Sequence, residues 1–483
     1  MNLWRVKPLD QILETAAKKS LKRQLGALQL TLLGIGAIIG TGIFVLTSVA
    51  AQKAGPGMMF SFVIAAIVCA LTALVYAEIA AMVPVSGSAY TYSYAVLGEF
   101  VAWMVGWALI LEYAVAAGAV AVGWSGYING FLREMGMGLP LALTAGPADT
   151  VTLPDGTTAT GAFNVLAFAI SLLVTWLLVI GTSKSAKVNA VLVSIKVLAL
   201  TVFVILTLPA VKVANFTPLL PNGWGSPLGS VGVLGAAASI FFAYVGFDAV
   251  STAAEETKNP NRNVPIGLIA SLAVCTVFYL LVAYAAVGAV GAQPDGPLSQ
   301  SKEPLAFVLR EIGYSQVGNW VAAAAIIALP SVILMMMYGQ TRILFVMSRD
   351  GLMPEVFSKI HPKFHTPHVV TIITGIAVSL FAAMFPVGAL ADISNSGTLF
   401  AFFIVALGVM VLRRKQPDRF RPFRTPIIWF VGPAAMAGCV LLFFSLGWPT
   451  LRLFLIWAAV GIAVYFLYSM NRSALSPRNA GKS

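Results

Sequence analysis

Glycine interrupts the first apolar segment of the chain, in the stretch Gly34-Ile35-Gly36-Ala37-Ile38-Ile39-Gly40-Thr41-Gly42-Ile43-Phe44. A second apolar segment is interrupted at the matching place in the other half, at Phe241-Phe242-Ala243-Tyr244-Val245-Gly246-Phe247-Asp248. Inside a lipid bilayer an unpaired backbone amide is costly, so a membrane helix is rarely broken without a reason. Paired breaks in corresponding segments therefore predict a ligand site near the middle of a membrane.

The composition indicates a membrane protein with many crossings. The chain has 483 residues, of which 59% are hydrophobic and only 10% are charged. A soluble domain of this size does not bury so much apolar surface. The first 26 residues are polar and basic, and we expect no cleavable signal peptide. The three cysteines all fall in apolar runs, which favours packing over a disulfide framework.

Twelve apolar segments are each near the ~20 residues that a bilayer requires. They run at about 27–50, 58–82, 100–127, 162–181, 188–209, 231–254, 265–290, 319–341, 369–385, 393–412, 427–447 and 451–470. If both chain ends are placed in the cytoplasm, 23 of the 30 Lys and Arg residues fall on the cytoplasmic side and six on the other. This imbalance predicts a multi-pass protein of the cell membrane with cytoplasmic N- and C-termini.

The net charge of +12 is concentrated in cytoplasmic tracts such as 413–424. We interpret these tracts as topology signals and contacts with anionic membrane lipid, and we expect no nucleic-acid partner. The chain has no phosphate-binding loop for ATP, and no nucleophile–base pair or metal cluster is visible in the apolar segments. We therefore expect no cofactor, no metal site and no enzymatic activity. The histidines, all in the loop 361–368, favour an ordinary interfacial loop over a metal site.

The two interruptions divide the chain into two similar units. Residues 27–212 and 228–412 each hold five apolar segments, and each unit begins with a broken one. Because five is odd, the second unit must be inverted in the membrane relative to the first. The predicted fold is thus all-α, with a five-plus-five inverted repeat, two further helices over 427–470, a basic arm at 1–26 and a tail at 471–483. The outer loop at 131–161, rich in Gly, Pro and Thr, is expected to be irregular.

The first interruption offers backbone groups to a ligand. Glycines such as Gly36 and Gly42 permit an unwound backbone. The freed amides at the start of the second half-helix suit a carboxylate, while the carbonyls of Ile38 and Ile39 suit an ammonium group. Close packing of small residues between helices is the alternative explanation for these glycines.

The second interruption complements the first. Phe242, Ala243 and Tyr244 present backbone carbonyls suited to an amine, and Phe247 is placed to cover the pocket. Asp248 follows the break, where we favour a helix-capping role over ion coupling. Amides for an acid and carbonyls for an amine together predict a zwitterionic amino acid as the ligand.

Three buried acids and bases are candidates for further roles. Lys196 lies midway along the fifth segment, where a lysine is costly, and there it serves either proton coupling or a tie to the unwound carbonyls of the first segment. Glu112 lies midway along the third segment, where it either assists substrate or proton binding or stays protonated and hydrogen-bonded. Glu78, near the cytoplasmic end of the second segment, is expected within reach of water.

Six motifs in this order resemble the amino acid–polyamine–organocation superfamily, and most closely the bacterial relatives of the cationic amino acid transporters. They are Gly-Ile-Gly-Ala-Ile-Ile-Gly-Thr-Gly-Ile-Phe (34–44), Pro-Val-Ser-Gly-Ser-Ala-Tyr-Thr-Tyr (84–92), Ile-Leu-Glu-Tyr (110–113), Phe-Phe-Ala-Tyr-Val-Gly-Phe-Asp (241–248), Glu-Glu-Thr-Lys-Asn-Pro (255–260) and Met-Ser-Arg-Asp-Gly-Leu (347–352). The resemblance covers residues 25–470.

The resemblance implies a broken-helix fold and specific ligand contacts. It places a substrate carboxylate at Thr41 and Gly42. It places the substrate amine at Ile38, Phe242 and Val245.

The resemblance also implies roles for residues around this pocket. It makes Phe247 an outer gate, brings Glu112 close to the site, and matches Lys196 to the lysine of proton-coupled relatives. Arginine-carrying members have Gly-Ser where this chain has Met335 and Met336. A methionine there fills the space of a long cationic side chain, which favours small or medium neutral amino acids such as alanine.

We therefore expect proton-coupled symport of an L-amino acid by alternating access. An amino acid exchanger and a cationic amino acid transporter are alternatives within the same class. A channel or a nutrient sensor is the alternative from a different class. No charged ring or carbonyl filter favours a channel, and the tail after residue 470 is short for a signalling domain.

Overall fold

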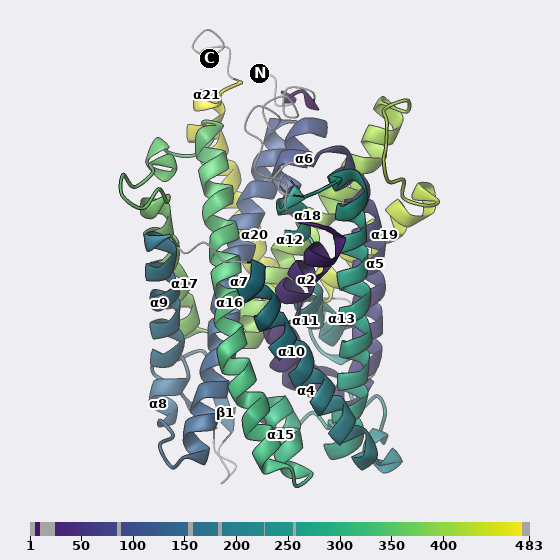
Figure 1. The fold of residues 1–483 in the computed structure, drawn as a ribbon, viewed down its shortest axis with the longest axis vertical. Helices are drawn as coiled ribbons and strands as arrows, with labels where there is room; N and C mark the ends of the chain where they lie inside the picture. The colour runs from purple at the N-terminus through teal and green to yellow at the C-terminus, as the bar shows by residue number, and fades with distance from the viewer. Residues whose placement is uncertain are drawn as a thin grey trace.

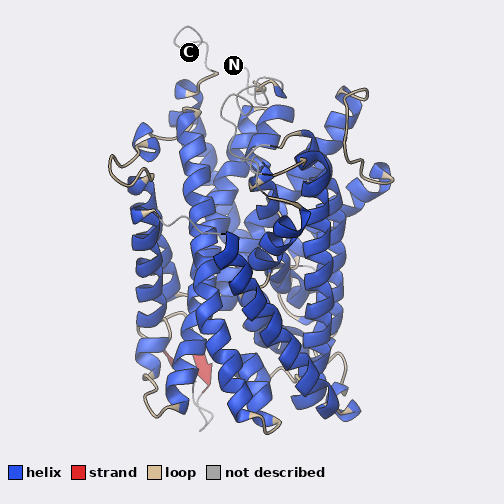
Figure 2. Ribbon diagram, in the orientation of Figure 1, coloured by secondary structure: helices blue, strands red, loops and turns tan. Residues whose placement is uncertain are grey.

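The computed structural model describes residues 5–9, 25–84, 88–152, 158–181, 186–226, 228–254 and 257–475. Its described part is a bundle of helices (Figures 1 and 2) with one small antiparallel hairpin, formed by β1 (Thr150–Thr152) and β2 (Thr158–Thr160). The hairpin and the short α8 lie in the predicted outer loop, which is therefore more ordered than its composition indicated. Glu255, Glu256 and most of the basic N-terminal arm lie outside the described residues.

The helices of the first half follow the predicted order. They are α2 (Ala27–Ile38), α3 (Thr41–Phe44), α4 (Leu46–Ala54), α5 (Met58–Met82), α6 (Ser88–Val96), α7 (Glu99–Glu134), α8 (Leu141–Thr144), α9 (Val165–Ile180) and α10 (Ala186–Thr207). The first predicted segment is divided into α2, α3 and α4, as its glycines indicated.

The second half again begins with a broken segment. Its helices are α11 (Gly232–Tyr244), α12 (Ala249–Thr252), α13 (Pro260–Val290), α14 (Pro297–Gln300), α15 (Pro304–Glu311), α16 (Ser315–Arg349), α17 (His368–Met384), α18 (Val387–Lys415), α19 (Ile428–Phe444), α20 (Trp448–Val464) and α21 (Met470–Arg472). Short 3-10 turns lie at η1 (Gly55–Gly57), η2 (Leu208–Ala210), η3 (Val213–Phe216) and η5 (Glu355–Ser358), and a π-helical turn lies at η6 (Tyr465–Ser469).

Seven helical stretches among the described residues are long and apolar enough to cross a membrane. They are Leu46–Met82, Glu99–Glu134, Val188–Ala210, Pro260–Val290, Ser315–Arg349, Val387–Lys415 and Trp448–Arg472. Five shorter apolar helices accompany them: Ala27–Ile38, Val165–Ile180, Gly232–Tyr244, His368–Met384 and Ile428–Phe444. All twelve predicted segments overlap these helices, and two of the short ones are the first halves of the broken segments. The chain is a multi-pass membrane protein.

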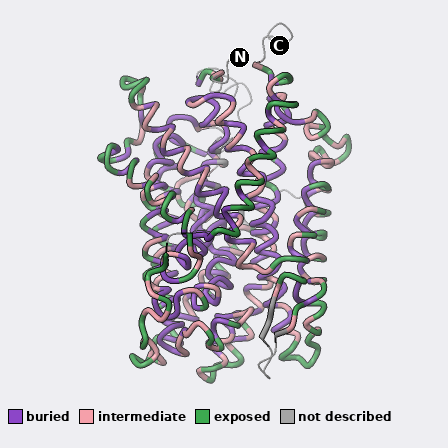
Figure 3. The backbone as a smooth tube through the Cα atoms, turned by 180° about the vertical axis from the view of Figure 1, so that it is seen from behind, coloured by how far each residue is buried: buried purple, intermediate pink, exposed green. Residues whose placement is uncertain are grey.

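Burial separates a central helix from peripheral ones. In the most apolar 18-residue stretch of α7, 94% is buried inside the bundle. In the corresponding stretch of Trp448–Arg472, which contains α20, only 22% is buried. Figure 3 shows the same gradient, with buried residues along the inside of the bundle and exposed ones on its outside and ends. α7 packs against α16 and α18, whereas the broken segments pack mainly against α5 and α13.

The two ends of the bundle are distinct. Figure 1 shows α6 and α21 at one end, and α8, β1 and α15 at the opposite end. At the first end, Asp350 accepts a hydrogen bond from Lys7 Nζ at 3.0 Å, and its carbonyl accepts one from the amide of Ala474. The described residues near both termini therefore lie at the same end of the molecule.

Candidate functional site

The first interruption lies between α2 and α3. α2 ends at Ile38, and Gly40 adopts a φ of −150° and a ψ of −147°, outside the helical region. α3 then begins at Thr41, whose side chain is buried and lacks a hydrogen-bond partner among the described residues. The first amides of a helix have no partner within it, so this break leaves polar backbone groups inside the bundle.

The second interruption lies between α11 and α12. Gly246 adopts a φ of +116°, a backbone conformation that side chains disfavour. Asp248 stands at the N-cap position of α12, as predicted, but its side chain makes no capping hydrogen bond. The carboxylate instead accepts a 3.4 Å hydrogen bond from the hydroxyl of Tyr113 on α7. The capping role is thus wrong, and Asp248 joins the break to the central helix.

The two interruptions touch each other. A methyl group added at Gly42 would lie 2.2 Å from the Cα of Ala243. A methyl group added at Gly246 would lie 2.9 Å from the carbonyl oxygen of Ala37. Each glycine therefore lets one broken segment approach the backbone of the other, which places both sets of freed polar groups in one region.

Tyr279 on α13 bridges the two interruptions. Its hydroxyl lies 2.9 Å from the carbonyl oxygen of Ile38 and 2.9 Å from that of Ala243. A hydroxyl carries one proton, so it serves the two carbonyls in turn or shares that proton between them. The Ile38 carbonyl thus has a donor within the protein, and its second lone pair remains available to an ammonium group. A tyrosine in an apolar helix needs a hydrogen-bond partner, but no local pattern indicates which group that partner is.

A small cavity lies where the interruptions meet. It has a volume of about 10 Å³, and its lining combines both breaks with α7 and α16. The lining residues are Ala37, Ile38, Gly40, Thr41, Gly42, Val120, Phe242, Val245, Val332 and Met336. The structure thus brings together six predicted site residues: Ile38, Thr41, Gly42, Phe242, Val245 and Met336. The sequence did not single out Val120 and Val332, because nothing local marks which face of a long apolar helix meets a cavity.

Three other predicted site residues lie outside the cavity lining. Ala243 packs behind Gly42. Phe247 is fully buried in an aromatic cluster, with ring centroids 6.1 Å from Tyr76 and 5.2 Å from Phe402. Glu112 is also buried, and its Oε2 has no hydrogen-bond partner among the described residues.

Lys196 reaches the first interruption from α10. Its ammonium nitrogen donates a 2.8 Å hydrogen bond to the carbonyl oxygen of Gly36, and the side chain is buried. This carbonyl belongs to the last turn of α2, where helix carbonyls lose their usual partners. The predicted tie between the fifth segment and the unwound first segment is present, and it leaves proton coupling open.

A partly buried ion pair that the sequence did not predict lies beside the second half of the first segment. Lys53 Nζ on α4 lies 2.8 Å from Asp392 Oδ2 on α18 and donates a 2.6 Å hydrogen bond to Ser239 Oγ on α11. Ser239 also donates to Asp392. The cluster joins one half of each broken segment to α18 at the end of the bundle opposite Asp350.

Glu78 is more enclosed than predicted. Its side chain is buried, and it binds Arg413 through two 2.7 Å hydrogen bonds. The Arg421 side chain lies 3.2 Å away, and the amide of Thr425 donates to Glu78 at 2.8 Å. The expectation that water reaches Glu78 is wrong, because the loop after α18 folds over it.

Known proteins resemble this chain along most of its length. Residues 25–481 match the amino acid permease family. The branched-chain amino acid permease BcaP of Bacillus subtilis (strain 168) is 46% identical over 470 residues, which are 97% of each chain. The methylthioribose transporter of the same organism is 43% identical over 477 residues, 98% of this chain and 99% of the relative. The human cationic amino acid transporter 4 is 35% identical over 85% of this chain and 62% of the relative.

These relatives are membrane transporters rather than enzymes, and the match extends across the apolar helices and both interruptions. The chain belongs to the amino acid permease family, within the amino acid–polyamine–organocation superfamily.

Proposed function

We propose that this protein is a proton-coupled symporter of neutral L-amino acids in the cell membrane. It crosses the membrane twelve times, with both termini in the cytoplasm. The units 27–212 and 228–412 form an inverted repeat, followed by two further helices over 427–470. Substrate binds between the two interruptions, and alternating access exposes this site first to one side and then to the other.

The observation that carries the proposal is the contact between the two interruptions. Gly42 faces Ala243, and Gly246 faces Ala37, so the breaks pair in a reciprocal way. The polar backbone groups near the cavity belong to both units. Ligands of transporters bind at such repeat interfaces, where half-helix amides receive an anionic group. The hydroxyl of Thr41, which has no hydrogen-bond partner in the described part of the chain, adds a polar side chain to the same place.

The side chains around the cavity favour a neutral apolar substrate. Val120, Val332, Phe242 and Met336 contribute apolar side chains to the cavity lining. Apolar walls with a few placed polar groups are typical of small-molecule sites. The similarity to a branched-chain amino acid permease supports aliphatic side chains of small or medium size. The similarity to a methylthioribose transporter makes that sugar a necessary comparison substrate.

The cavity has to expand before a substrate enters. A volume of about 10 Å³ holds no more than about one water molecule. Phe242 and Met336 are side chains that widen the cavity by changing rotamer. The ion pair of Lys53 with Asp392 joins α4 to α18 at one end, and that of Lys7 with Asp350 joins the N-terminal arm to the end of α16 at the other. Breaking them in turn is what alternating access requires of this structure.

Lys196 is our candidate for the coupling proton. Its ammonium group binds the carbonyl of Gly36, next to the residues that line the site. The positive charge strengthens this hydrogen bond. Loss of the proton therefore weakens the bond, and the contact between α10 and α2 becomes looser. A titratable side chain buried among membrane helices is costly and is typical of proton pathways. Substrate exchange without proton movement is the alternative, in which Lys196 only ties the helices together.

Uptake into liposomes tests the proposal. Purified protein is reconstituted, and uptake of alanine, leucine and methylthioribose is measured with and without an inward proton gradient. We expect the gradient to accelerate amino acid uptake, and Lys196→Met to lose this response. Lys212→Met, which alters an exposed lysine just beyond η2, is the matched control and should respond like the unaltered protein. Uptake that requires preloaded amino acid would instead identify an exchanger.

A further inference from the structure

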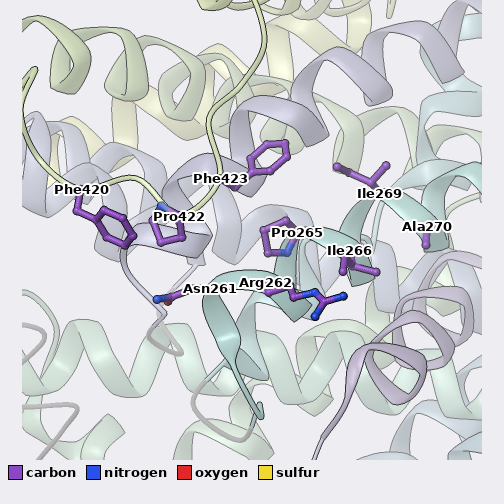
Figure 4. A pocket seen from close by; sticks show the side chains of 9 residues that line it. All are labelled: Asn261, Arg262, Pro265, Ile266, Ile269, Ala270, Phe420, Pro422 and Phe423. Atoms are coloured by element: carbon purple, nitrogen blue, oxygen red, sulfur yellow. The ribbon is translucent and has the colours of Figure 1, made fainter.

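An apolar groove separate from the cavity opens on the outer surface of the bundle. It has a volume of about 590 Å³ and lies between the beginning of α13 and the loop that follows α18 (Figure 4). Its lining residues are Asn261, Arg262, Pro265, Ile266, Ile269, Ala270, Phe420, Pro422 and Phe423. We propose that this groove binds an anionic phospholipid, with the phosphate at Arg262 and an acyl chain along α13.

The polar groups of the groove are confined to one end. Asn261 and Arg262 occupy the first turn of α13, while the remaining lining residues are apolar. Figure 4 shows the phenylalanine and proline side chains of the loop on one side and the apolar side chains of α13 on the other. A ligand that fits this arrangement has a polar head and a long apolar tail.

The apolar lining continues beyond the groove. Ile266 on α13 is 40% exposed, and further along the same helix Val274, Val277 and Leu281 are 38%, 59% and 39% exposed. Their spacings of three, four and eight residues place them along one face of a helix. An acyl chain that enters between Ile266 and Phe420 therefore has a continuous apolar surface to follow toward the middle of the membrane.

The charge around the groove suits an anion. The side chain of Arg262 is exposed and makes no hydrogen bond or ion pair with a described residue, and no acidic residue occurs between 257 and 284. The loop segment 413–424 contains six cations and one acidic residue, Asp418. Glu78 neutralises only part of this charge, because it binds both Arg413 and Arg421. The acidic pair at 255–256 lies outside the described residues.

The position of the groove matches a membrane surface. Phe420 is 75% exposed, and Arg414 lies over the ring of Trp429 at 5.1 Å, an arrangement of aromatic and basic residues typical of the lipid headgroup region. The loop that carries Phe420 also covers Glu78, at the end of α5 and α18 that we place in the cytoplasm. Basic pockets on this side of membrane proteins bind anionic lipid headgroups.

Native mass spectrometry of the purified full-length protein tests this inference. Phosphatidylglycerol and phosphatidylcholine of equal chain length are added in turn, and the lipid retained per protein is measured. We expect selective retention of phosphatidylglycerol. Arg262→Gln should weaken this retention about fivefold, because it removes one contact between a cation and the phosphate. Ile266→Trp, at a half-exposed position that tolerates a larger side chain, should fill the groove and weaken retention by a comparable factor.

Arg452→Gln is the matched control, because it removes an exposed arginine near the beginning of α20, away from the groove. It should retain phosphatidylglycerol like the unaltered protein, and thermal unfolding should show that all three variants are folded. Equal retention of both lipids, or equal behaviour of Arg262→Gln and Arg452→Gln, would overturn the proposal. Displacement by glycerol phosphate at the same concentration as the lipid would also overturn it, since the acyl chain would then contribute nothing.

Discussion

The ammonium nitrogen of Lys53 lies 2.8 Å from the carboxylate of Asp392, across 339 residues of sequence. The contact joins the last turn of α4 to the beginning of α18, and Ser239 of α11 completes it. It therefore holds parts of both units together at the end of the bundle that we place outside the cell.

Replacing Lys53 with Gln should open this end of the bundle. The buried Asp392 carboxylate would lose its counter-ion, and breaking a buried ion pair costs about 3–5 kcal/mol. Because the pair is partly exposed here, we expect a smaller cost of about 2 kcal/mol. The measurement is labelling of Val120→Cys by an impermeant maleimide, in a protein whose three buried native cysteines are replaced by alanine.

We expect labelling to become at least tenfold faster in Lys53→Gln. The double variant Lys53→Gln with Asp392→Asn is the control, since it removes both charges and leaves none unpaired. Its labelling rate should fall between those of the other two proteins. An unchanged rate in Lys53→Gln would mean that this ion pair does not hold the outer end closed.

Replacing Tyr279 with Phe should weaken the junction between the interruptions. The carbonyls of Ile38 and Ala243 would both lose their hydroxyl donor, and an unsatisfied buried polar group costs about 1–3 kcal/mol. We expect a lower unfolding temperature and slower transport. Tyr284→Phe is the control, because Tyr284 is 44% exposed and stacks on Phe216. If both variants behave alike, the two hydrogen bonds contribute nothing measurable.

Replacing Met336 with Ser should widen the choice of substrate toward arginine or lysine. Met336 lines the cavity, so a shorter and polar side chain leaves room for a long cationic one. Changes of this size in a pocket alter the preference for one substrate over another by about 10- to 200-fold. Competition of arginine and lysine with alanine uptake measures the effect. Met335→Ser is the control, since Met335 does not line the cavity, and transport of neither cation by Met336→Ser would refute the pocket assignment.

Replacing Gly42 with Ala should prevent the two interruptions from packing. The added methyl group would lie 2.2 Å from the Cα of Ala243, so a backbone has to move. Overpacking of this kind costs typically about 1–3 kcal/mol, and more against backbone. We expect loss of transport and a lower unfolding temperature. Gly388→Ala is the control, because its added methyl group would lie 3.4 Å from the nearest atom, on Val49, and should leave transport and unfolding temperature unchanged. An equal loss in Gly388→Ala would show that the effect at Gly42 does not come from its contact with Ala243.

The sequence by itself determined the features that depend on nearby residues. The apolar segments follow from composition, and both interruptions follow from glycines whose backbone freedom acts where they stand. The breaks themselves predicted Ile38 and Phe242, and the family resemblance added Thr41, Gly42 and Val245; all five line the cavity. The membrane environment makes such predictions effective, because a break in hydrocarbon is too costly to be incidental.

The tertiary structure alone decided which distant groups meet. Tyr279 reaches Ile38 across 241 residues, and Glu78 reaches Arg413 across 335, and no local pattern specifies either pairing. The packing also directs Phe247 into the cluster with Tyr76 and Phe402, because the turn at Gly246 sets the direction of the residues after it. The sequence thus determined where the helices break, and packing decided which side chains fill, bridge and close the space between them.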